Sequence, residues 1–141
     1  DYFILFEDLD LSYRLRLAGH AILSVEDAIV LHRGGTGGIS FRGAIEYPRR
    51  RAFFHSRNRW IYLYKCYSWR TLLVAAPGLL LYELVWLAFT LRSRTFGGWW
   101  EGKRDFLAKL SGVRARRRAI QATRRRPDRE LLVGGPLTLS A

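Results

Sequence analysis

Three carboxylates, Glu7, Asp8 and Asp10, lie close together near the start of this 141-residue chain. An adjacent pair such as Glu7 and Asp8 is costly to hold charged, and such a pair at the end of a strand is a candidate general base. The alternative is a helix N-terminus, where acidic side chains satisfy backbone N–H groups and need no further purpose. Asp8 and Asp10 also have the acid-x-acid spacing of a weak metal-binding pair. These residues alone leave all three interpretations open.

His32 is the one histidine whose setting suggests chemistry. It follows an apolar segment at residues 28–31 and precedes a glycine-rich stretch at residues 33–45. A histidine in such a place can bind a metal ion, and it can equally have a structural role. His20 and His55 have no comparable setting, and we assign them no function.

The elements that must position these residues follow from the pattern of apolar side chains. Residues 2–6 are apolar and aromatic and predict a short buried strand. Residues 8–18 predict a helix, because leucines and an alanine recur on one face and Gly19 follows as a stop signal. Residues 21–25 and 28–31 predict extended, β-rich segments.

The order of these features resembles the end of the catalytic domain of family 2 glycosyltransferases, which are inverting enzymes with a GT-A fold. The resemblance covers residues 1–65 and is of the rhamnosyltransferase-like bacterial type. It rests on Glu7-Asp8, Asp10-Leu11, Arg14, Gly19 and His32, and on Arg57-Asn58-Arg59. It implies the C-terminal portion of a GT-A (Rossmann-like) α/β domain, followed by membrane-associated helices and a basic tail.

The resemblance also implies roles for single residues. Asp8 would be the catalytic base, with Glu7 beside it. His32 would be one ligand of a divalent metal ion, Mg²⁺ or Mn²⁺, whose other ligands and whose nucleotide-binding half lie upstream. The chain is then a C-terminal fragment, and we expect it to be inactive alone. The remaining candidates for substrate binding are Asp10, Arg14, Arg57 and Asn58.

The implied reaction moves a sugar from a nucleotide-sugar donor to a cell-surface glycan or a lipid-linked acceptor. Asp8 would take a proton from the acceptor hydroxyl, whose oxygen then attacks the anomeric carbon from the face opposite the nucleotide. The metal ion would stabilise the leaving diphosphate. The implied place is the bacterial cytoplasmic membrane, with the catalytic part facing the cytosol.

The charge of the chain indicates an anionic partner. It has 24 basic and 12 acidic residues, a formal net charge of +12, and arginine clusters at residues 116–118 and 124–126. Such a chain can bind acidic lipid, phosphorylated substrates or nucleic acid. It shows no zinc-finger, RRM or helix-turn-helix pattern, so we expect an anionic membrane surface and no nucleic acid. A basic membrane- or nucleic-acid-binding module without catalysis is the alternative function.

Residues 71–91 are almost wholly apolar, and Glu83 is their single charged residue. A helix of this length reaches about 30 Å, the thickness of a bilayer core. It can span the membrane, dip in and return at Pro77-Gly78, or lie in the interface. Both flanks are basic, which favours two cytosolic ends. Glu83 is costly in a membrane unless it is paired.

The chain is therefore expected to have four parts. Residues 1–45 would be the C-terminal part of the GT-A catalytic domain, and residues 46–70 an amphipathic juxtamembrane helix. Residues 71–91 would be the hydrophobic membrane segment. Residues 92–141 would form a basic amphipathic tail that is partly disordered, above all beyond residue 127.

Overall fold

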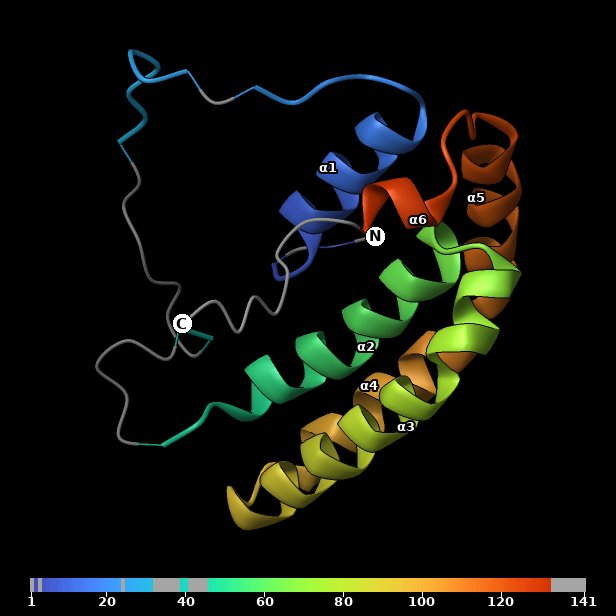
Figure 1. The fold of residues 1–141 in the computed structure, drawn as a ribbon. Coiled ribbons are helices and arrows are strands. Elements are labelled where there is room, and N and C mark those ends of the chain that lie inside the picture. Colours follow the sequence, from blue (N-terminus) through green and yellow to red (C-terminus); the bar gives the residue numbers. More distant parts are fainter. Residues whose placement is uncertain (1, 3, 24, 32–38, 41–45, 133–141) are drawn as a thin grey trace, which may run out of the picture.

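The computed structural model describes residues 2, 4–23, 25–31, 39–40 and 46–132. These residues form six helices joined by turns and extended segments (Figure 1). The helices are α1 (Glu7–Leu17), α2 (Arg49–Cys66), α3 (Trp69–Arg92), α4 (Phe96–Ala108), α5 (Leu110–Ala122) and α6 (Asp128–Leu131).

Helices α2, α3 and α4 contact one another through side chains, and α5 continues along the C-terminal half of α2 (Figure 1). α3 runs antiparallel to α2, and the short turn between them is fixed by Ser68, whose Oγ accepts a hydrogen bond from the Thr71 backbone N–H at 3.1 Å. α4 then returns in the direction of α2. α1 and α6 lie at the C-terminal end of α2, where they contact each other.

The core is divided between two clusters on α2. The first joins α1, α2 and α6 through Tyr13, Leu17, Tyr62, Leu63, Cys66 and Leu131. Leu72 and Leu79 of α3 pack against this cluster from the other side. The second cluster consists of Ile61, Phe106 and Val113, which join α2 to α4 and α5. α2 contributes residues to both clusters and is therefore the central helix.

Glycines allow α4 to approach the backbone of α2 closely. A Cβ atom added to Gly98 would lie 2.4 Å from the carbonyl oxygen of Arg49, and one added to Gly102 would lie 2.5 Å from that of Phe53. Any side chain at either position would therefore overlap with main-chain atoms. The Gly-x-x-x-Gly spacing places both glycines on one face of the helix, one turn apart.

The predicted α/β fold class is wrong for the residues that the structure describes, because these contain helices and no strand. The described parts of residues 2–6, 21–25 and 28–31, all predicted to be β-rich, are irregular. A strand is stable only beside another strand, and the described residues offer no neighbouring strand to these segments. The apolar side chains of residues 21–23 and 25–31 are exposed, by 83% for Ile29 and 95% for Leu31, whereas Tyr2 and Phe6 are partly buried against the first core cluster. The predicted GT-A portion is thus not seen as a sheet domain.

The helix predictions fare better. α1 ends one residue before its predicted end, and Gly19 follows with a φ of +98°, a conformation that glycine adopts without strain. α2 confirms the helix predicted before the apolar segment. α3 covers the apolar segment and runs through Pro77 without a break. Residues 96–131, which belong to the predicted basic tail, form α4, α5 and α6.

Candidate functional site

The acidic turn at the start of α1 is held in place by Asn58 of α2. Leu5 and Phe6 precede the helix with positive φ angles of 66° and 69°, a region that costs a residue with a Cβ roughly 1–2 kcal/mol. Asn58 is fully buried, and its Nδ2 donates to the carbonyl oxygens of Ile4 and Leu5 at 2.7 and 3.0 Å. These two bonds fix the unusual turn. The structure therefore gives Asn58 a positioning role.

Asp10 anchors α1 to α2 from within the core. Its carboxylate lies 3.0 Å from Lys65 Nζ and 2.8 Å from Arg14 Nε, and it accepts hydrogen bonds from the Tyr2 hydroxyl and the Cys66 thiol. Burial alone would raise the pKa of Asp10. The hydrogen bonds and charges of Lys65 and Arg14 outweigh burial and hold that pKa below its usual value.

The same surroundings shift the pKa of the neighbouring Cys66 thiol upward. Burial raises the pKa of the Cys66 thiol far above its usual range, and the Asp10 carboxylate raises it further. Cys66 is fully buried and therefore stays protonated. Asp10 and Arg14, two of the candidates for substrate binding, thus form an ion pair on α1. Through Asp10 this pair also includes the buried Lys65 of α2.

Glu7 and Asp8 are both exposed on the first turn of α1. They point in different directions, because successive residues of a helix lie about 100° apart. Glu7 borders a surface cavity of about 480 Å³ that is also lined by Arg14, Lys65 and Arg116. Asp8 lies outside this lining. Both predicted catalytic carboxylates are accessible from solvent, and Glu7 alone faces a set of basic side chains.

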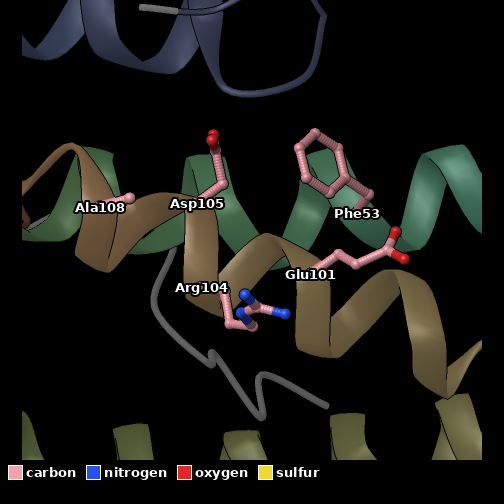
Figure 2. Close-up of a pocket in the computed structure, with 5 residues that line it drawn as sticks. All are labelled: Phe53, Glu101, Arg104, Asp105 and Ala108. Atoms are coloured by element: carbon pink, nitrogen blue, oxygen red, sulfur yellow. The ribbon is translucent and has the colours of Figure 1, made fainter.

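Arg57 connects α2 to α4. Its Nε donates to Asn58 Oδ1 at 2.8 Å, its guanidinium lies 3.3 Å from Asp105, and the group sits 5.1 Å from the ring centre of Phe54. Asp105 and Phe53 border a second surface cavity of about 500 Å³, shown in Figure 2. Asp105 and Phe53 project from one side of the two helices in Figure 2 and Arg104 from the other. The lining contains no carboxylate from α1, and this cavity is separate from the acidic turn.

His32 lies outside the described residues, as does most of the glycine-rich stretch at residues 33–45. The predicted ligand of a divalent metal ion is therefore not placed relative to Glu7 and Asp8. Within the described part of the chain, no group of three or more histidine, cysteine, aspartate or glutamate residues is arranged to hold a metal ion. The Mg²⁺ or Mn²⁺ site stays a prediction that rests on the resemblance.

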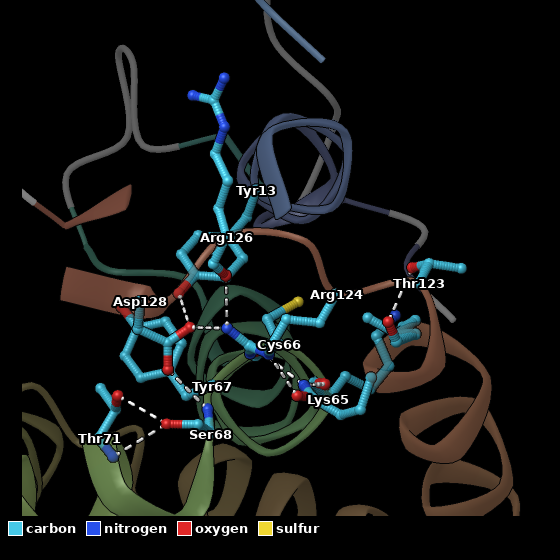
Figure 3. A network of polar contacts seen from close by, with 12 residues as sticks. Tyr13, Lys65, Cys66, Tyr67, Ser68, Thr71, Thr123, Arg124, Arg126 and Asp128 are labelled. Carbon is cyan, nitrogen blue, oxygen red and sulfur yellow. Dashed lines mark hydrogen bonds and ion pairs between the residues drawn. The ribbon is translucent and has the colours of Figure 1, made fainter. Parts of the chain in front are cut away.

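A further polar network, shown in Figure 3, centres on Asp128. Asp128 Oδ1 accepts from the Tyr13 hydroxyl and from Arg124, each at 2.6 Å, and Oδ2 accepts from the Ser68 backbone N–H at 2.7 Å. Burial opposes ionisation of Asp128, but hydrogen bonds from Thr71, Tyr13 and the Ser68 backbone hold its pKa far below the usual range. The network joins α1, the start of α3 and α6.

Glu83, the single acidic residue in the apolar segment, has three polar partners. It accepts a hydrogen bond from Trp60 Nε1 at 3.0 Å, it lies 2.6 Å from Lys103 Nζ, and it forms an ion pair with Arg59. The Arg59 guanidinium also lies 3.9 Å from the centre of the Tyr82 ring. This cluster joins α2, α3 and α4, and it removes the penalty that an unpaired Glu83 would carry.

Sequence reasoning missed Lys65, Asp128 and the partners of Glu83. One signal was available for two of them. The chain has 24 basic residues but only three lysines, and each lysine forms an ion pair with a carboxylate. The pairs are Lys65 with Asp10, Lys103 with Glu83, and Lys109 with Asp105. Asp128 gave no comparable signal beyond being an acid among arginines.

Comparison with known proteins assigns no family. No protein-family model matches the chain, and neither a curated protein nor a solved structure matches it. The resemblance to family 2 glycosyltransferases therefore depends on the quoted residues alone. The geometry of α1 and α3 is the further basis on which a function can be proposed.

Proposed function

We propose that this chain is the membrane-attached C-terminal part of an inverting, family 2 type glycosyltransferase. It would serve transfer of a sugar from a nucleotide-sugar donor to a cell-surface glycan or lipid-linked acceptor, at the cytosolic face of the bacterial cytoplasmic membrane. One observation carries the proposal: the carboxylates of α1 are divided into two kinds. Asp10 is buried in ion pairs, whereas Glu7 and Asp8 are exposed.

This difference between the buried Asp10 and the exposed Glu7 and Asp8 is consistent with Asp8 as a general base. Asp10 with Lys65, and Asn58 with the turn before α1, fix the helix, so that its first turn is presented to solvent in one orientation. Asp8 on that turn is exposed and therefore accessible to an acceptor hydroxyl. A bound divalent metal ion, with His32 as one ligand, would stabilise the leaving diphosphate. The donor site would be formed by residues outside the described part of the chain, as the resemblance implies.

The basic residues beside Glu7 support the same assignment. Arg14 and Arg116 line the cavity that Glu7 borders, and guanidinium groups bind phosphate oxygens in two-pronged geometry. Arg57 and Asn58 would act indirectly, since their contacts lie between α2, α4 and the turn before α1. The proposed partners are thus the nucleotide-sugar donor, the acceptor and an anionic membrane surface, with no nucleic acid.

The test replaces Asp8 in the enzyme expressed from its complete gene. Asp8→Asn should lower the rate of sugar transfer by about 10²- to 10⁴-fold, because the general base is lost while the shape of the side chain is kept. Binding of the donor should be almost unchanged. Asp27→Asn, an exposed aspartate in the turn after α1, is the matched control and should transfer sugar normally. Near-normal transfer by Asp8→Asn would exclude Asp8 as the base.

A membrane-binding module without catalysis is the second candidate function, and the exposed apolar surface of α3 favours it. Both candidates predict binding to lipid, and only the first predicts sugar transfer. Flotation with anionic vesicles, run beside a DNA-binding assay, separates both from a nucleic-acid-binding module. Salt-sensitive binding to DNA without binding to vesicles would contradict both candidates.

A further inference from the structure

We propose that α3 lies in the plane of an anionic membrane surface, with its outer face among the acyl chains and with α2 and α4 on the cytosolic side. This inference rests on the membrane attachment proposed above and is independent of sugar transfer. It names the orientation of the helix and the class of lipid that it contacts. The sequence had left spanning, re-entrant and interfacial placements open.

The outer face of α3 is a continuous apolar stripe. The helix has 24 residues, its most apolar 18-residue window has a mean hydropathy of 2.0, and none of that window is buried in the protein. An exposed apolar surface of this extent marks a binding site for lipid or for another protein. The stripe consists of Leu73, Val74, Leu80, Leu81, Leu84 and Val85, and the exposed Pro77 and Gly78 lie between Val74 and Leu80.

The inner face of α3 contacts α2 near its start and middle, and near its end it contacts Tyr47, which precedes α2. Near the start of α3, Leu72 and Leu79 pack against the first core cluster. Further along, Trp86 Nε1 donates to Ser56 Oγ at 2.9 Å, and Phe89 lies edge-on to Tyr47 with ring centres 5.0 Å apart. α3 therefore cannot leave α2 without breaking contacts at both of its ends and at Glu83 between them.

This attachment argues against a transmembrane orientation. If α3 crossed the bilayer in this packing, α2 would be carried into the hydrocarbon with it, and α4 would follow. α2 begins with three arginines at residues 49–51, and it contains Arg57, Arg59 and Lys65. Each charged residue in a bilayer core carries a large penalty. An orientation in the plane of the surface immerses only the uncharged outer face.

Re-entry is disfavoured for a separate reason. A segment that enters and leaves the bilayer on one side must reverse its direction, and the predicted place for this was Pro77-Gly78. α3 is instead a continuous helix from Trp69 to Arg92. Pro77 and Gly78 both lie on the exposed side of this helix. The helix therefore has no reversal that could return it to the same surface.

The ends of α3 indicate that the lipid is anionic. Arg70 lies at one end, and Arg92 and Arg94 lie at the other, all exposed. Trp69 and Trp100 are also exposed, and tryptophan prefers the headgroup level of a membrane. A helix in the plane of the surface places both arginine groups at the same depth, beside phosphate headgroups. If a second protein covered this face instead of lipid, it would have to offer acidic residues at both ends of an apolar groove. An anionic membrane surface meets both requirements without such a match.

The first experiment measures flotation of the 141-residue chain with vesicles of phosphatidylcholine, with and without phosphatidylglycerol. Leu84→Glu, in the centre of the stripe, should weaken binding about tenfold or more, because a charge enters the acyl region. Leu9→Glu is the matched control and should bind like the unaltered chain. Leu9 is 55% exposed on α1 against 64% for Leu84, and α1 packs on α2 and α6. Circular dichroism verifies that both variants are folded.

Equal binding by the two variants would overturn the proposal, as would equal binding to vesicles with and without phosphatidylglycerol. Leu81→Glu, also on the stripe, repeats the test should Leu84→Glu lose its helical signal. Because flotation does not depend on catalysis, these results are independent of the Asp8→Asn experiment. A chain that floats but belongs to an inactive enzyme would leave this proposal intact and contradict the proposed function.

The second experiment determines the orientation. Single cysteines replace Arg70 and Arg92 in separate variants, while the natural Cys66 is buried and stays unreactive. The chain is added to preformed sealed vesicles and treated with a membrane-impermeant maleimide. Both positions should react to the same extent as they do after detergent is added. Protection of either position until detergent is added would show that α3 crosses the bilayer and would overturn the in-plane orientation.

Discussion

Asp10 and Glu101 form ion pairs of similar length in very different surroundings. The side chains of Asp10 and Lys65 are 4% and 5% exposed, whereas those of Glu101 and its partner Arg49 are 52% and 63% exposed. A buried charge that loses its partner retains its full desolvation cost, while an exposed one is hydrated at once. The same chemical change should therefore have different consequences at the two sites.

Asp10→Asn should lower the free energy of unfolding by about 3–5 kcal/mol, because Lys65 is left charged in the core. Glu101→Gln should lower it by about 1 kcal/mol or less. Urea unfolding followed by circular dichroism measures both. The double variant Asp10→Asn with Lys65→Met should recover part of the loss. No recovery in that double variant would show that Asp10 stabilises the fold by some route other than its pair with Lys65.

His55 gives the fold a dependence on pH. Burial, together with the nearby charge of Arg59, lowers the pKa of His55 from 6.5 to about 4, so the folded protein holds this imidazole neutral. The unfolded chain binds a proton at its ordinary pKa. The stability that a neutral His55 contributes is thus fully present above pH 6.5 and is lost as the pH falls from 6.5 to about 4.

The free energy of unfolding should accordingly fall over that interval by less than about 1.4 kcal/mol per pH unit, the limit for one proton. His55→Phe should keep the ring contact with Trp86, whose centre lies 4.3 Å away, and should flatten the profile between pH 6.5 and 4. A variant whose profile still falls as steeply would assign the dependence to another group. The stability that ionised Asp10 and Asp128 contribute is present at neutral pH. It is lost mainly as the pH falls below 3.8, the ordinary pKa of aspartate, since the pKa values of both are depressed in the folded protein.

At the scale of elements, the contact of α4 with α2 depends on the absence of two side chains. Gly98→Ala and Gly102→Ala would each place a methyl group within 2.5 Å of a carbonyl oxygen on α2, so that the helices must separate. Each substitution should lower the free energy of unfolding by about 1–3 kcal/mol. Gly112→Ala is the control within α5, where the nearest atom is the flexible end of Arg116 at 3.5 Å.

The control should be neutral or should stabilise the protein by up to about 1 kcal/mol, because alanine is the better helix former. Thermal unfolding of the three variants measures the difference. If Gly98→Ala and Gly102→Ala were as stable as Gly112→Ala, the close approach of α4 to α2 would not be present in solution.

The sequence predicted α1, α2 and α3 because a helix is stabilised by hydrogen bonds within its own segment. The strands failed for the opposite reason: residues 21–25 and 28–31 have the composition of strands, but a strand needs a neighbour that composition does not supply. α4 and α5 were not predicted as separate packed helices, because their many basic residues indicated a basic tail. Their packing depends on Gly98, Gly102 and a few apolar side chains. The sequence does not show that these residues face α2, because the surface of α2 that they contact is known only from the structure.

The candidate site shows the same division between local and distant contacts. The acidic residues at the start of α1 were evident, since Glu7, Asp8 and Asp10 are adjacent in the chain. Their separation into exposed and buried carboxylates was not evident, because it is imposed by Lys65 and Asn58, which lie more than forty residues away. A single sequence does not reveal which of several acids meets a distant lysine.

At the scale of the whole molecule, Glu83 is the point at which α2, α3 and α4 meet. Glu83→Gln would leave Arg59 and Lys103 side by side without a counter-charge, and we expect it to lower the free energy of unfolding by about 3–5 kcal/mol. Glu83→Gln with Lys103→Met should be more stable than Glu83→Gln alone. Urea unfolding measures both, and equal stability of the two variants would contradict the role of this cluster.

The carboxylate of Asp128 has a mechanical consequence. One of its oxygens is held by Tyr13 of α1, and the other is held by the backbone of Ser68, which directly precedes α3. A carboxylate is a planar, rigid group only a few ångströms across, so it acts as a short link between two helices that are otherwise far apart in the sequence. Any force that tilts the start of α3 is transmitted through this link to the helix that bears Glu7 and Asp8.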